Sequence, residues 1–436
     1  MKLIGMLSRF NPVKVLVIGD FMLDTYTTGK VKRISPEAPV SVLHVLKEES
    51  RPGGAGNVVL NLISLGAQVT AIGRVGYDFA GEELRTFLEK EGVNIEALFF
   101  QKGFKTPVKN RLIADAQQVL RVDFESISAM PEVLEQAVIE KLPHLLGECQ
   151  TIAISDYGKG FLTPSLLATI IEMARARNIP VIVDPKGDDF SKYQGATILK
   201  PNLNEAYAAA RLPHEVPLDE VAKSILKKCS VDELLITRSE AGITLFHKTG
   251  ERFDFPVRSK EVKDVTGAGD TVLAMIGIAM ANGLDVKHAA QLANIAAGMA
   301  IERLGCARIN LSEMAERLLE FDVENKIFDE EHLFALQQSL KGKRCTMLAL
   351  ESSLGMSTAI FRSIRNLSYR RAGHKLIVYV RDENPDEEFV SLLSSLSEVD
   401  FIILKCESIK NLCEVLHPIE AFEMDEGKLV SLEHLV

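Results

Sequence analysis

The chain has 436 residues, which suits one large domain followed by a small one. Its formal net charge of −10 argues against a general nucleic-acid-binding protein, which needs a basic face to neutralise phosphates. No segment approaches the ~18 apolar residues of a membrane-spanning helix, and the six scattered cysteines form no CxxC pair and no zinc spacing. We therefore expect a cytoplasmic protein with reduced thiols and no membrane partner.

Short β-rich runs alternate with amphipathic stretches through the first part of the chain. The predicted strands are residues 13–19, 69–72, 151–155, 180–183, 196–199 and 233–237, and the predicted helices between them include 57–65, 80–91 and 164–177. This alternation predicts a doubly wound α/β fold, with a largely parallel sheet covered on both faces. Ligands bind at the carboxyl ends of the strands in such sheets, so polar residues directly after a strand are candidates for a site.

Residues 20–54 interrupt this rhythm, with β-like alternation, several Gly and Pro residues and no long helix, and we expect them to form a small antiparallel flap. Asp20 and Asp24 follow the first strand, where their carboxylates could accept hydrogen bonds from ligand hydroxyl groups or simply cap a turn. The sequence PGGAGN at 52–57 then opens a helix. Gly53 and Gly54 permit a ligand to approach the backbone closely, and Asn57 can both donate and accept hydrogen bonds.

Basic residues recur in the middle of the first part. Lys109, Arg111 and Arg121 form a series on alternating positions that would share one face of a strand. A solvated edge strand would look similar, but an anionic ligand explains the positive series better. Lys186 directly follows a predicted strand, within the sequence DPKG, and is a further candidate for binding a phosphate.

The strongest single signal is the sequence DVTGAGDT at 264–271, directly before an apolar helical run from 272 to 282. Gly267 and Gly269, with Ala268 between them, let the backbone turn tightly and leave successive N–H groups exposed at a helix N-terminus, where the helix dipole favours an anion. Asp270 would begin the helix, suited to accept a proton from an attacking hydroxyl group. A glycine-rich turn capped by an aspartate remains the alternative for this segment taken alone.

The PGGAGN and DVTGAGD elements, in this order, resemble the two signatures of the ribokinase-like (PfkB) sugar kinase family. Further segments resemble the kinase half of the bacterial bifunctional heptose-7-phosphate kinase/heptose-1-phosphate adenylyltransferases: ISPEAPV at 34–40, RPGGAGN at 51–57, RVDFE at 121–125, SDYGK at 155–159, DPKG at 184–187 and TRSE at 237–240. The match covers nearly all of residues 10–318. It implies an ATP- and Mg²⁺-dependent kinase of the 7-phosphate sugar, working as a homodimer.

The resemblance assigns roles residue by residue. It implies that Asp270 is the catalytic base and that Gly267, Ala268 and Gly269 form the anion hole, with Gly267 and Gly269 also contacting ATP. In the segment PNLNE, Asn202 would approach the nucleotide phosphates, and Glu205 would hold Mg²⁺, through water. The sugar phosphate would contact the residues named above (Asp20, Asp24, Gly53, Gly54, Asn57, Lys109, Arg111, Arg121, Lys186), and ATP would also contact Thr237, Ser239, Gly242 and Asn294.

The second half resembles the adenylyltransferase domain of the same family but departs from its pattern. We expect a kinase domain over 1–318, a linker helix over 319–343 and a smaller Rossmann-like domain over 344–436. Within the linker, residues 326–341 are the helix candidate. The family's nucleotide loop carries an HxGH motif, whereas residues 348–358 here read LALESSLGMST without a histidine. His374, after Gly373, directly precedes the predicted strand 375–380, so a surface histidine is the better interpretation. We therefore expect a degenerate second domain without adenylyltransferase activity.

Two alternatives stay open. The chain could be a kinase of the same family that acts on another sugar phosphate or a nucleoside. It could also be a catalytically silent scaffold in which both halves serve assembly. The intact residues Asp270, Gly267, Gly269 and Glu205 argue against this for the first half, whereas for the second domain an assembly or partner-binding role is the leading interpretation.

Overall fold

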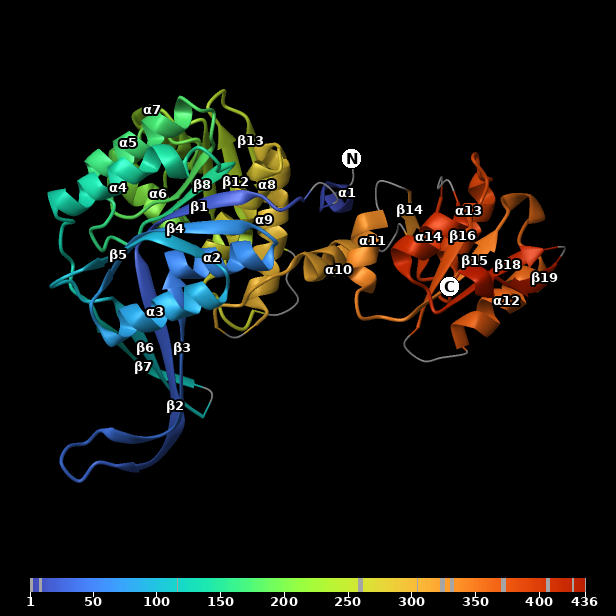
Figure 1. Ribbon diagram of the computed structural model, residues 1–436, viewed down its shortest axis with the longest axis horizontal. Coiled ribbons are helices and arrows are strands. Elements are labelled where there is room, and N and C mark those ends of the chain that lie inside the picture. Colours follow the sequence, from blue (N-terminus) through green and yellow to red (C-terminus); the bar gives the residue numbers. More distant parts are fainter. Residues whose placement is uncertain are drawn as a thin grey trace. The chain divides into compact units, whose positions relative to one another are not determined.

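The computed structural model describes the whole chain except residues 1–2, 8–9, 116, 258–261, 304, 322–325, 330–332, 370–373, 405–407, 426 and 436. Gly373, and Cys406 among the six cysteines, therefore lie outside the described residues. The chain forms two compact units, one of residues Asn11–Asn310 and one that joins Met1–Phe10 to Leu311–Val436 (Figure 1). Along the described residues, no helix is long and apolar enough to cross a membrane.

The larger unit is built on a sheet of nine described strands. Its strands are parallel from β5 to β11, with β12 and β13 added antiparallel at one edge, in the order β13-β12-β11-β10-β9-β8-β1-β4-β5. These strands are β1 (Lys14–Gly19), β4 (Gln68–Gly76), β5 (Asn94–Gln101), β8 (Thr151–Ser155), β9 (Val181–Asp184), β10 (Ile198–Leu199), β11 (Glu233–Thr237), β12 (Ile243–His247) and β13 (Arg252–Phe255). The predicted doubly wound α/β fold is confirmed.

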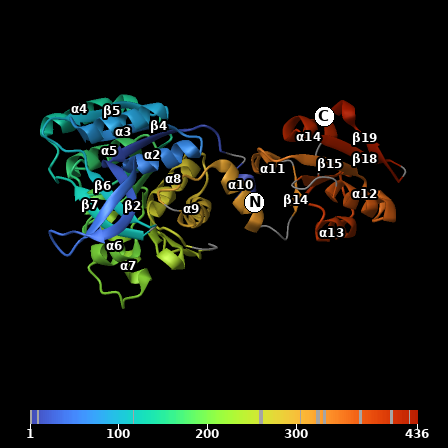
Figure 2. The same cartoon turned by 90° about the horizontal axis from the view of Figure 1, so that it is seen from below.

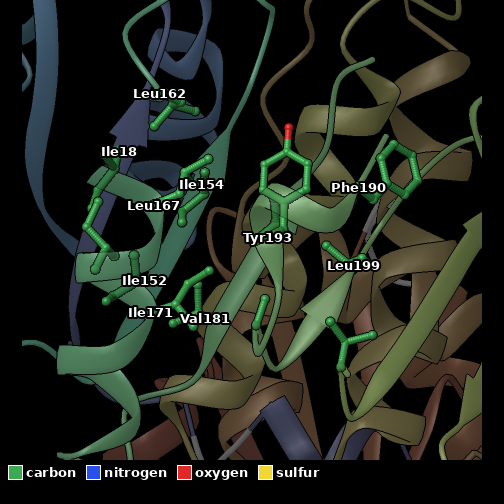
Figure 3. Packing of buried hydrophobic residues seen from close by; sticks show 14 of the residues in the cluster. Ile18, Ile152, Ile154, Leu162, Leu167, Ile171, Val181, Phe190, Tyr193 and Leu199 are labelled. Carbon is green, nitrogen blue, oxygen red and sulfur yellow. The ribbon is translucent and has the colours of Figure 1, made fainter. Parts of the chain in front are cut away.

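Helices cover both faces of this sheet. One face carries α4 (Glu132–Leu145), α5 (Pro164–Arg175), α6 (Leu203–Ala210) and α7 (Leu218–Cys229), and the other side of the unit carries α2 (Ala55–Ser64), α3 (Phe79–Lys90), α8 (Ala268–Ala281) and α9 (Val286–Ile301). Because alternate side chains of a strand point to opposite faces, Ile18, Ile152 and Ile154 enter the α4–α5 core (Figure 3). With aromatic residues sparse, this core is mainly Leu, Ile, Val and Ala.

The flap is larger than the sequence predicted. The hairpin of β2 (Phe21–Ile34) and β3 (Ser41–Gly54) is antiparallel, as expected, and it extends away from the body of the unit (Figure 1). The flap sheet also contains β6 (Val108–Ala114), parallel to β2, and β7 (Gln117–Phe124), antiparallel to β6 (Figure 2). The basic series of the sequence therefore lies on the flap, which we call the lid from here on.

The segment DVTGAGD ends in a longer helix than the apolar run indicated. Helix α8 begins at Ala268, and Gly267 is its N-cap with the left-handed backbone angle φ of 78° that favours glycine. Asp270 is therefore the third residue of the helix, in its first turn. Strands β1, β8, β9 and β10 all end beside this helix start, so the carboxyl edge of the sheet collects the candidate residues.

The smaller unit is a second, mostly parallel α/β layer with the strand order β14-β17-β16-β15-β18-β19, in which only β19 is antiparallel. Its strands are β14 (Ile327–Phe328), β15 (Cys345–Leu350), β16 (Lys375–Val380), β17 (Phe401–Ile403), β18 (Glu420–Asp425) and β19 (Lys428–Ser431). Its helices are α1 (Leu3–Leu7), α10 (Leu311–Phe321), α11 (Leu333–Leu340), α12 (Thr358–Tyr369), α13 (Glu387–Ser395) and α14 (Ile409–Leu416). The expected Rossmann-like second domain is present.

One predicted element in this region is wrong. The sequence indicated a helix over 326–341, but Ile327 and Phe328 form strand β14 beside β17, and helix α11 begins only at Leu333. Ile327 and Phe328 are apolar and β-prone, and pairing with β17 buries Phe328 against Phe401. Tertiary pairing thus outweighed the local helical pattern.

Candidate active site

The N-terminus of α8 forms the centre of the candidate site. Asp264 stabilises the preceding turn, because its carboxylate accepts hydrogen bonds from the N–H and hydroxyl groups of Thr266 (2.9 and 2.7 Å) and from the N–H of Gly305 (2.9 Å). The N–H groups of Gly269 and Asp270 lie in the first helical turn, where the helix itself provides no acceptor. Together with the helix dipole, they can stabilise an anion such as a transferring phosphoryl group.

Asp270 is almost completely enclosed, with 4% of its surface exposed. Its Oδ2 accepts a hydrogen bond from the Asn57 side chain (2.7 Å) and its Oδ1 accepts one from the Tyr157 hydroxyl (2.9 Å). Burial raises the pKa of Asp270 to about 7, the Asp184 carboxylate acts in the same direction, and both hydrogen bonds oppose the rise. A carboxylate that titrates near neutrality is suited to general-base chemistry.

A buried ion pair lies beside the glycine turn. Lys200, directly after β10, pairs with Asp184 at the end of β9 (2.9 Å), and the Lys200 side chain is 3% exposed. A Cβ atom added to Gly269 would lie 3.4 Å from the Lys200 Nζ, so this ammonium group adjoins the helix start. A cation there can stabilise negative charge that develops on a phosphoryl group.

Four residues predicted to bind the sugar phosphate, Asp20, Asp24, Gly53 and Gly54, lie together where the lid joins the body of the larger unit. We call this junction the hinge. Asp24 pairs with Arg111 (2.5 Å), and a Cβ atom added to Gly53 would come within 2.2 Å of the Asp24 carboxylate, so a side chain at position 53 would displace that carboxylate. Gly54 adopts a φ of 56° at the start of α2. The Oδ2 atom of Asp20 accepts hydrogen bonds from the backbone N–H groups of residues 157 and 159 (3.0 and 2.9 Å), so Asp20 fixes the loop after β8.

The three residues of the basic series, Lys109, Arg111 and Arg121, lie in different environments. The Arg111 guanidinium is neutralised by Asp24 and lies over the Tyr26 ring, while Arg121, directly opposite Arg111 in the β6–β7 register, is half exposed and pairs with Asp123. The Nζ atom of Lys109 lies over the Tyr157 ring, 4.9 Å from the ring centre. Burial lowers the pKa of Lys109, and the like charges of Lys159 and Arg121 act in the same direction. These three cations are thus electrostatically coupled.

Asn202 and Glu205 form a capping box at the start of α6. The Asn202 side chain accepts from the N–H of Glu205 (2.9 Å), and the Glu205 carboxylate accepts from the N–H of Asn202 (3.1 Å). The same carboxylate pairs with Lys186 (2.7 Å), whose stem lies near Gly158. Lys186 therefore lies between the loop after β8 and the carboxylate expected to hold Mg²⁺.

The donors suit a magnesium ion that is held mainly by a nucleotide. Within the described residues, no group of three or more His, Cys, Asp or Glu side chains could hold a metal ion by itself. Mg²⁺ usually keeps several waters and takes only one or two carboxylates besides substrate phosphates. Glu205, with Asp184 near enough to interact with it electrostatically, fits that arrangement.

A cavity of about 460 Å³ opens beside the glycine turn, where Ala268 and Gly269 form part of its wall. Its wall contains most of the residues predicted to contact ATP, and apolar side chains such as Ile243, Val272 and Ile301 complete it. Asn294 donates to the carbonyl of Pro256 (2.9 Å) and so fixes the strand end beside it. The predicted residues in this wall are Thr237, Ser239, Gly242, Ala268, Gly269 and Asn294. Asn202, Glu205 and Gly267 are not part of it.

Three residues of the site were not assigned from the sequence: Tyr157, Asp184 and Lys200. Each lies at the end of a parallel strand or within two residues after it, a position that the sheet topology marks as a ligand edge. Tyr157 and Asp184 occur in segments that carried the family resemblance, SDYGK and DPKG. The rule about strand ends could therefore have found all three, but their mutual distances could not be read from the sequence.

The chain is similar to known proteins in sequence and in fold. A family model described as pfkB family carbohydrate kinase matches residues 13–313. Similar curated proteins include the Bifunctional protein HldE of Trichlorobacter lovleyi, 44% identical over 333 residues (76% of this chain and 68% of the relative), and that of Campylobacter jejuni, 44% identical over 332 residues (76% and 69%). That of Syntrophotalea carbinolica is 42% identical over 322 residues (72% and 66%). The match thus spans about two thirds of each relative.

Solved structures with the same fold include Arabidopsis thaliana ribokinase complexed with ribose and ATP, with a TM-score of 0.57 and 17% identity over 71% of this chain and 99% of that one. Escherichia coli phosphofructokinase-2 in complex with potassium has a TM-score of 0.59 and 18% identity over the same shares. At such identities the likeness concerns the fold alone.

Proposed function

Because the chain belongs to the pfkB family of carbohydrate kinases, we propose that it transfers the γ-phosphoryl group of ATP to the anomeric hydroxyl of D-glycero-D-manno-heptose 7-phosphate. The product is the 1,7-bisphosphate, on the route to ADP-heptose and the lipopolysaccharide core. The observation that carries the proposal is the buried Asp270 at the N-terminus of α8, between the nucleotide-sized cavity and the cations of the lid.

Asp270 acts as the base. Its carboxylate accepts the proton of the attacking hydroxyl group as the oxygen–phosphorus bond forms, and Asn57 holds Oδ2 during this step. The Gly269 and Asp270 N–H groups, with Lys200 beside them, stabilise the charge on the phosphoryl oxygens. When bound with ATP, Mg²⁺ neutralises phosphate charge, and Glu205 is the residue that would hold it through water.

The lid supplies the cations for the phosphate that the substrate already carries. Lys109 and Arg121 belong to the lid strands β6 and β7, and Lys159 belongs to the loop that Asp20 fixes. Arg121 pairs with Asp123 and Lys159 pairs with Glu125 (2.6 Å), but both cations still repel the Lys109 ammonium group, and a phosphate dianion bound among the three would relieve that repulsion. Arg111, neutralised by Asp24, instead stabilises the hinge of the lid.

A coupled assay of ADP release tests the substrate. Heptose 7-phosphate should give the largest kcat/KM in a panel that also contains fructose phosphates, unphosphorylated hexoses and nucleosides. A higher value for another panel member would replace the proposed substrate with that compound and leave the kinase assignment in place.

The smaller unit is proposed to lack adenylyltransferase activity. The loop after β15 contains no histidine, and its polar groups bond within the unit: the Ser352 N–H donates to Asp382 (2.6 Å), and the Ser352 hydroxyl accepts from the N–H of Asp386 (3.1 Å). We keep an assembly or partner-binding role for this unit as the alternative that its intact fold favours.

A homodimer is the proposed assembly, and the cytoplasm is the proposed compartment. The lid exposes large apolar side chains, Ile34 (70%), Leu46 (61%) and Val119 (57%) among them, which a second copy could cover. All five described cysteines are free thiols, as a reducing compartment favours. Sedimentation analysis of the full chain and of an Ile34→Lys/Leu46→Lys variant tests the dimer, which this variant should weaken.

A further inference from the structure

The Tyr157 side chain makes a contact with the base that the proposed mechanism does not use. Its hydroxyl donates to Oδ1 of Asp270 (2.9 Å), while Asn57 donates to Oδ2 (2.7 Å). We propose that Tyr157 is a positioning residue for phosphoryl transfer, whose hydroxyl orients the Asp270 carboxylate and keeps it in the proton-accepting form. The inference rests on the proposed function only in taking Asp270 as the base.

Tyr157 is held in place by groups on both sides of it. Its backbone N–H donates to Oδ2 of Asp20 (3.0 Å), and the N–H of Asp156 donates to the carbonyl of Asp184 (3.1 Å), so the loop is anchored to the ends of β1 and β9. Its ring lies beneath the ammonium group of Lys109 (4.9 Å), which belongs to the lid. With the backbone and the ring both fixed, the hydroxyl has little freedom to leave Asp270.

The hydroxyl can act only as a hydrogen-bond donor to Asp270. Burial raises the pKa of Tyr157 well above its ordinary value, and the nearby charges of Asp270 and Asp184 act in the same direction, so the phenol keeps its proton. Each carboxylate oxygen offers two lone pairs, so Oδ1 can accept from Tyr157 and still receive the proton of the sugar hydroxyl. Tyr157 therefore orients the base without exchanging a proton with the substrate.

The charged and titratable groups around Asp270 explain why a second donor matters. Asp184 at the end of β9 repels the ionised form, and Lys200 after β10 attracts it. Cys306 follows α9, and burial raises the pKa of its thiol to about 12, so it stays neutral. Apart from the hydrogen bonds, Lys200 is the main group favouring the ionised form, and it is already paired with Asp184. The two donors, Asn57 and Tyr157, thus compensate for burial.

The test is the pH dependence of kcat/KM for Tyr157→Phe, which removes only the hydroxyl. The variant lacks one hydrogen-bond donor to the ionised Asp270 carboxylate, so the midpoint of the acidic limb in its profile of kcat/KM against pH should rise by about one pH unit. At pH values below the midpoints of both wild type and variant, kcat/KM of the variant should therefore fall about tenfold more than it does at high pH. Tyr207→Phe is the matched control, because Tyr207 is buried and its hydroxyl donates to the carbonyl of Val216 (2.7 Å), away from Asp270. It should leave the limb unchanged.

A second measurement needs no sugar. In the free enzyme labelled with ¹³C at aspartate carboxyl carbons, the Asp270 signal is assigned by its loss in Asp270→Asn, and its titration midpoint should rise in Tyr157→Phe but not in Tyr207→Phe. An unchanged midpoint and an unchanged limb in a folded Tyr157→Phe protein would overturn the inference. Absence of wild-type turnover with heptose 7-phosphate would refute the proposed substrate instead, and the ¹³C titration would still decide the role of Tyr157.

Discussion

Asp270 combines two properties that are rarely found together at the surface of a helix: it is enclosed by protein, and it stands in the first turn, where the backbone N–H groups favour an anion. Burial raises its pKa to about 7, and donors from α2 and from the loop after β8 limit the rise. The same residue would be a simple helix cap if it were exposed. Enclosure is what suits it to act as a base.

The wild-type enzyme should therefore lose activity on the acidic side of neutrality. A base must be ionised to accept a proton, and the raised pKa of Asp270 means that its ionised fraction falls as the pH drops through about 7. A profile of kcat/KM against pH, with saturating ATP, should show one acidic limb near that value. A limb below pH 5 would contradict the environment described for this carboxylate.

Asp270→Asn should lower kcat by about 10²–10⁴ and leave ATP binding largely intact, since general-base catalysis contributes that much. The cavity wall is formed by other residues, so nucleotide affinity, measured by calorimetry, provides the control. Turnover near the wild-type value would show that another group accepts the proton.

Lys186→Ala should raise the KM for the sugar phosphate if Lys186 binds the substrate phosphate, as the sequence suggested. Its ion pair with Glu205 offers a second possibility, in which the main increase is in the KM for MgATP. Lys186 lies between the loop after β8 and α6, from where it can move toward either phosphate. Initial rates with each substrate varied in turn distinguish these two possibilities. Unchanged KM values for both would remove it from the site.

Among the secondary-structure elements, the lid contributes site residues from β6 and β7 as well as from the β2–β3 hairpin. Strands β6 and β7 join β2 and β3 in one sheet, so residues 108–124, distant in sequence from the hairpin, bring Lys109 and Arg111 to the hinge. The hinge depends on a glycine, because the Asp24 carboxylate occupies the space where a side chain of Gly53 would lie. Lid and base are thereby connected through one tightly packed hinge.

Gly53→Ala should displace Asp24, separate it from Arg111 and raise the sugar KM several-fold or more. The added Cβ atom would come within 2.2 Å of the Asp24 carboxylate. Gly277→Ala in α8 is the control, since its Cβ atom would have no neighbour closer than 3.9 Å, and alanine favours a helix. Steady-state kinetics of both variants, with melting temperatures, test this; equal KM values would show that the hinge adapts.

On the scale of the whole molecule, two α/β units occur in one chain, and the candidate residues of the kinase reaction all lie in the unit of residues 11–310. The larger unit ends at residue 310, and residues 1–10 belong to the smaller unit. The domain limits proposed from sequence, 1–318 and 344–436, remain a prediction that limited proteolysis can test.

The full chain incubated with ATP and heptose 1-phosphate should release no pyrophosphate above background, because the loop after β15 lacks the histidines that would stabilise a triphosphate. A pyrophosphate-coupled assay measures this, with the kinase reaction of the same preparation as the control for folded protein. Clear turnover would show that the smaller unit is an active transferase.

The sequence was sufficient to predict the fold class, the parallel order implied by alternating strands and helices, and the two glycine-rich helix starts. These features rest on local patterns: period-two and helical hydrophobicity, and glycines at positions with positive φ. It also identified Asp270 and Asn57 as candidates, although it could not show that they touch. For 326–341 the local pattern was misleading, because β14 forms only by pairing with β17.

The three-dimensional structure was needed to identify the groups that surround DVTGAGD. Tyr157, Asp184 and Lys200 come from three different strand ends, and their distances to Asp270 and Gly269 depend on the order of strands in the sheet. It also distinguished the lid cations, pairing Arg111 with Asp24 and setting Lys109 over Tyr157. Burial and long-range pairing produce these effects, and neither is encoded in the spacing of residues along the chain.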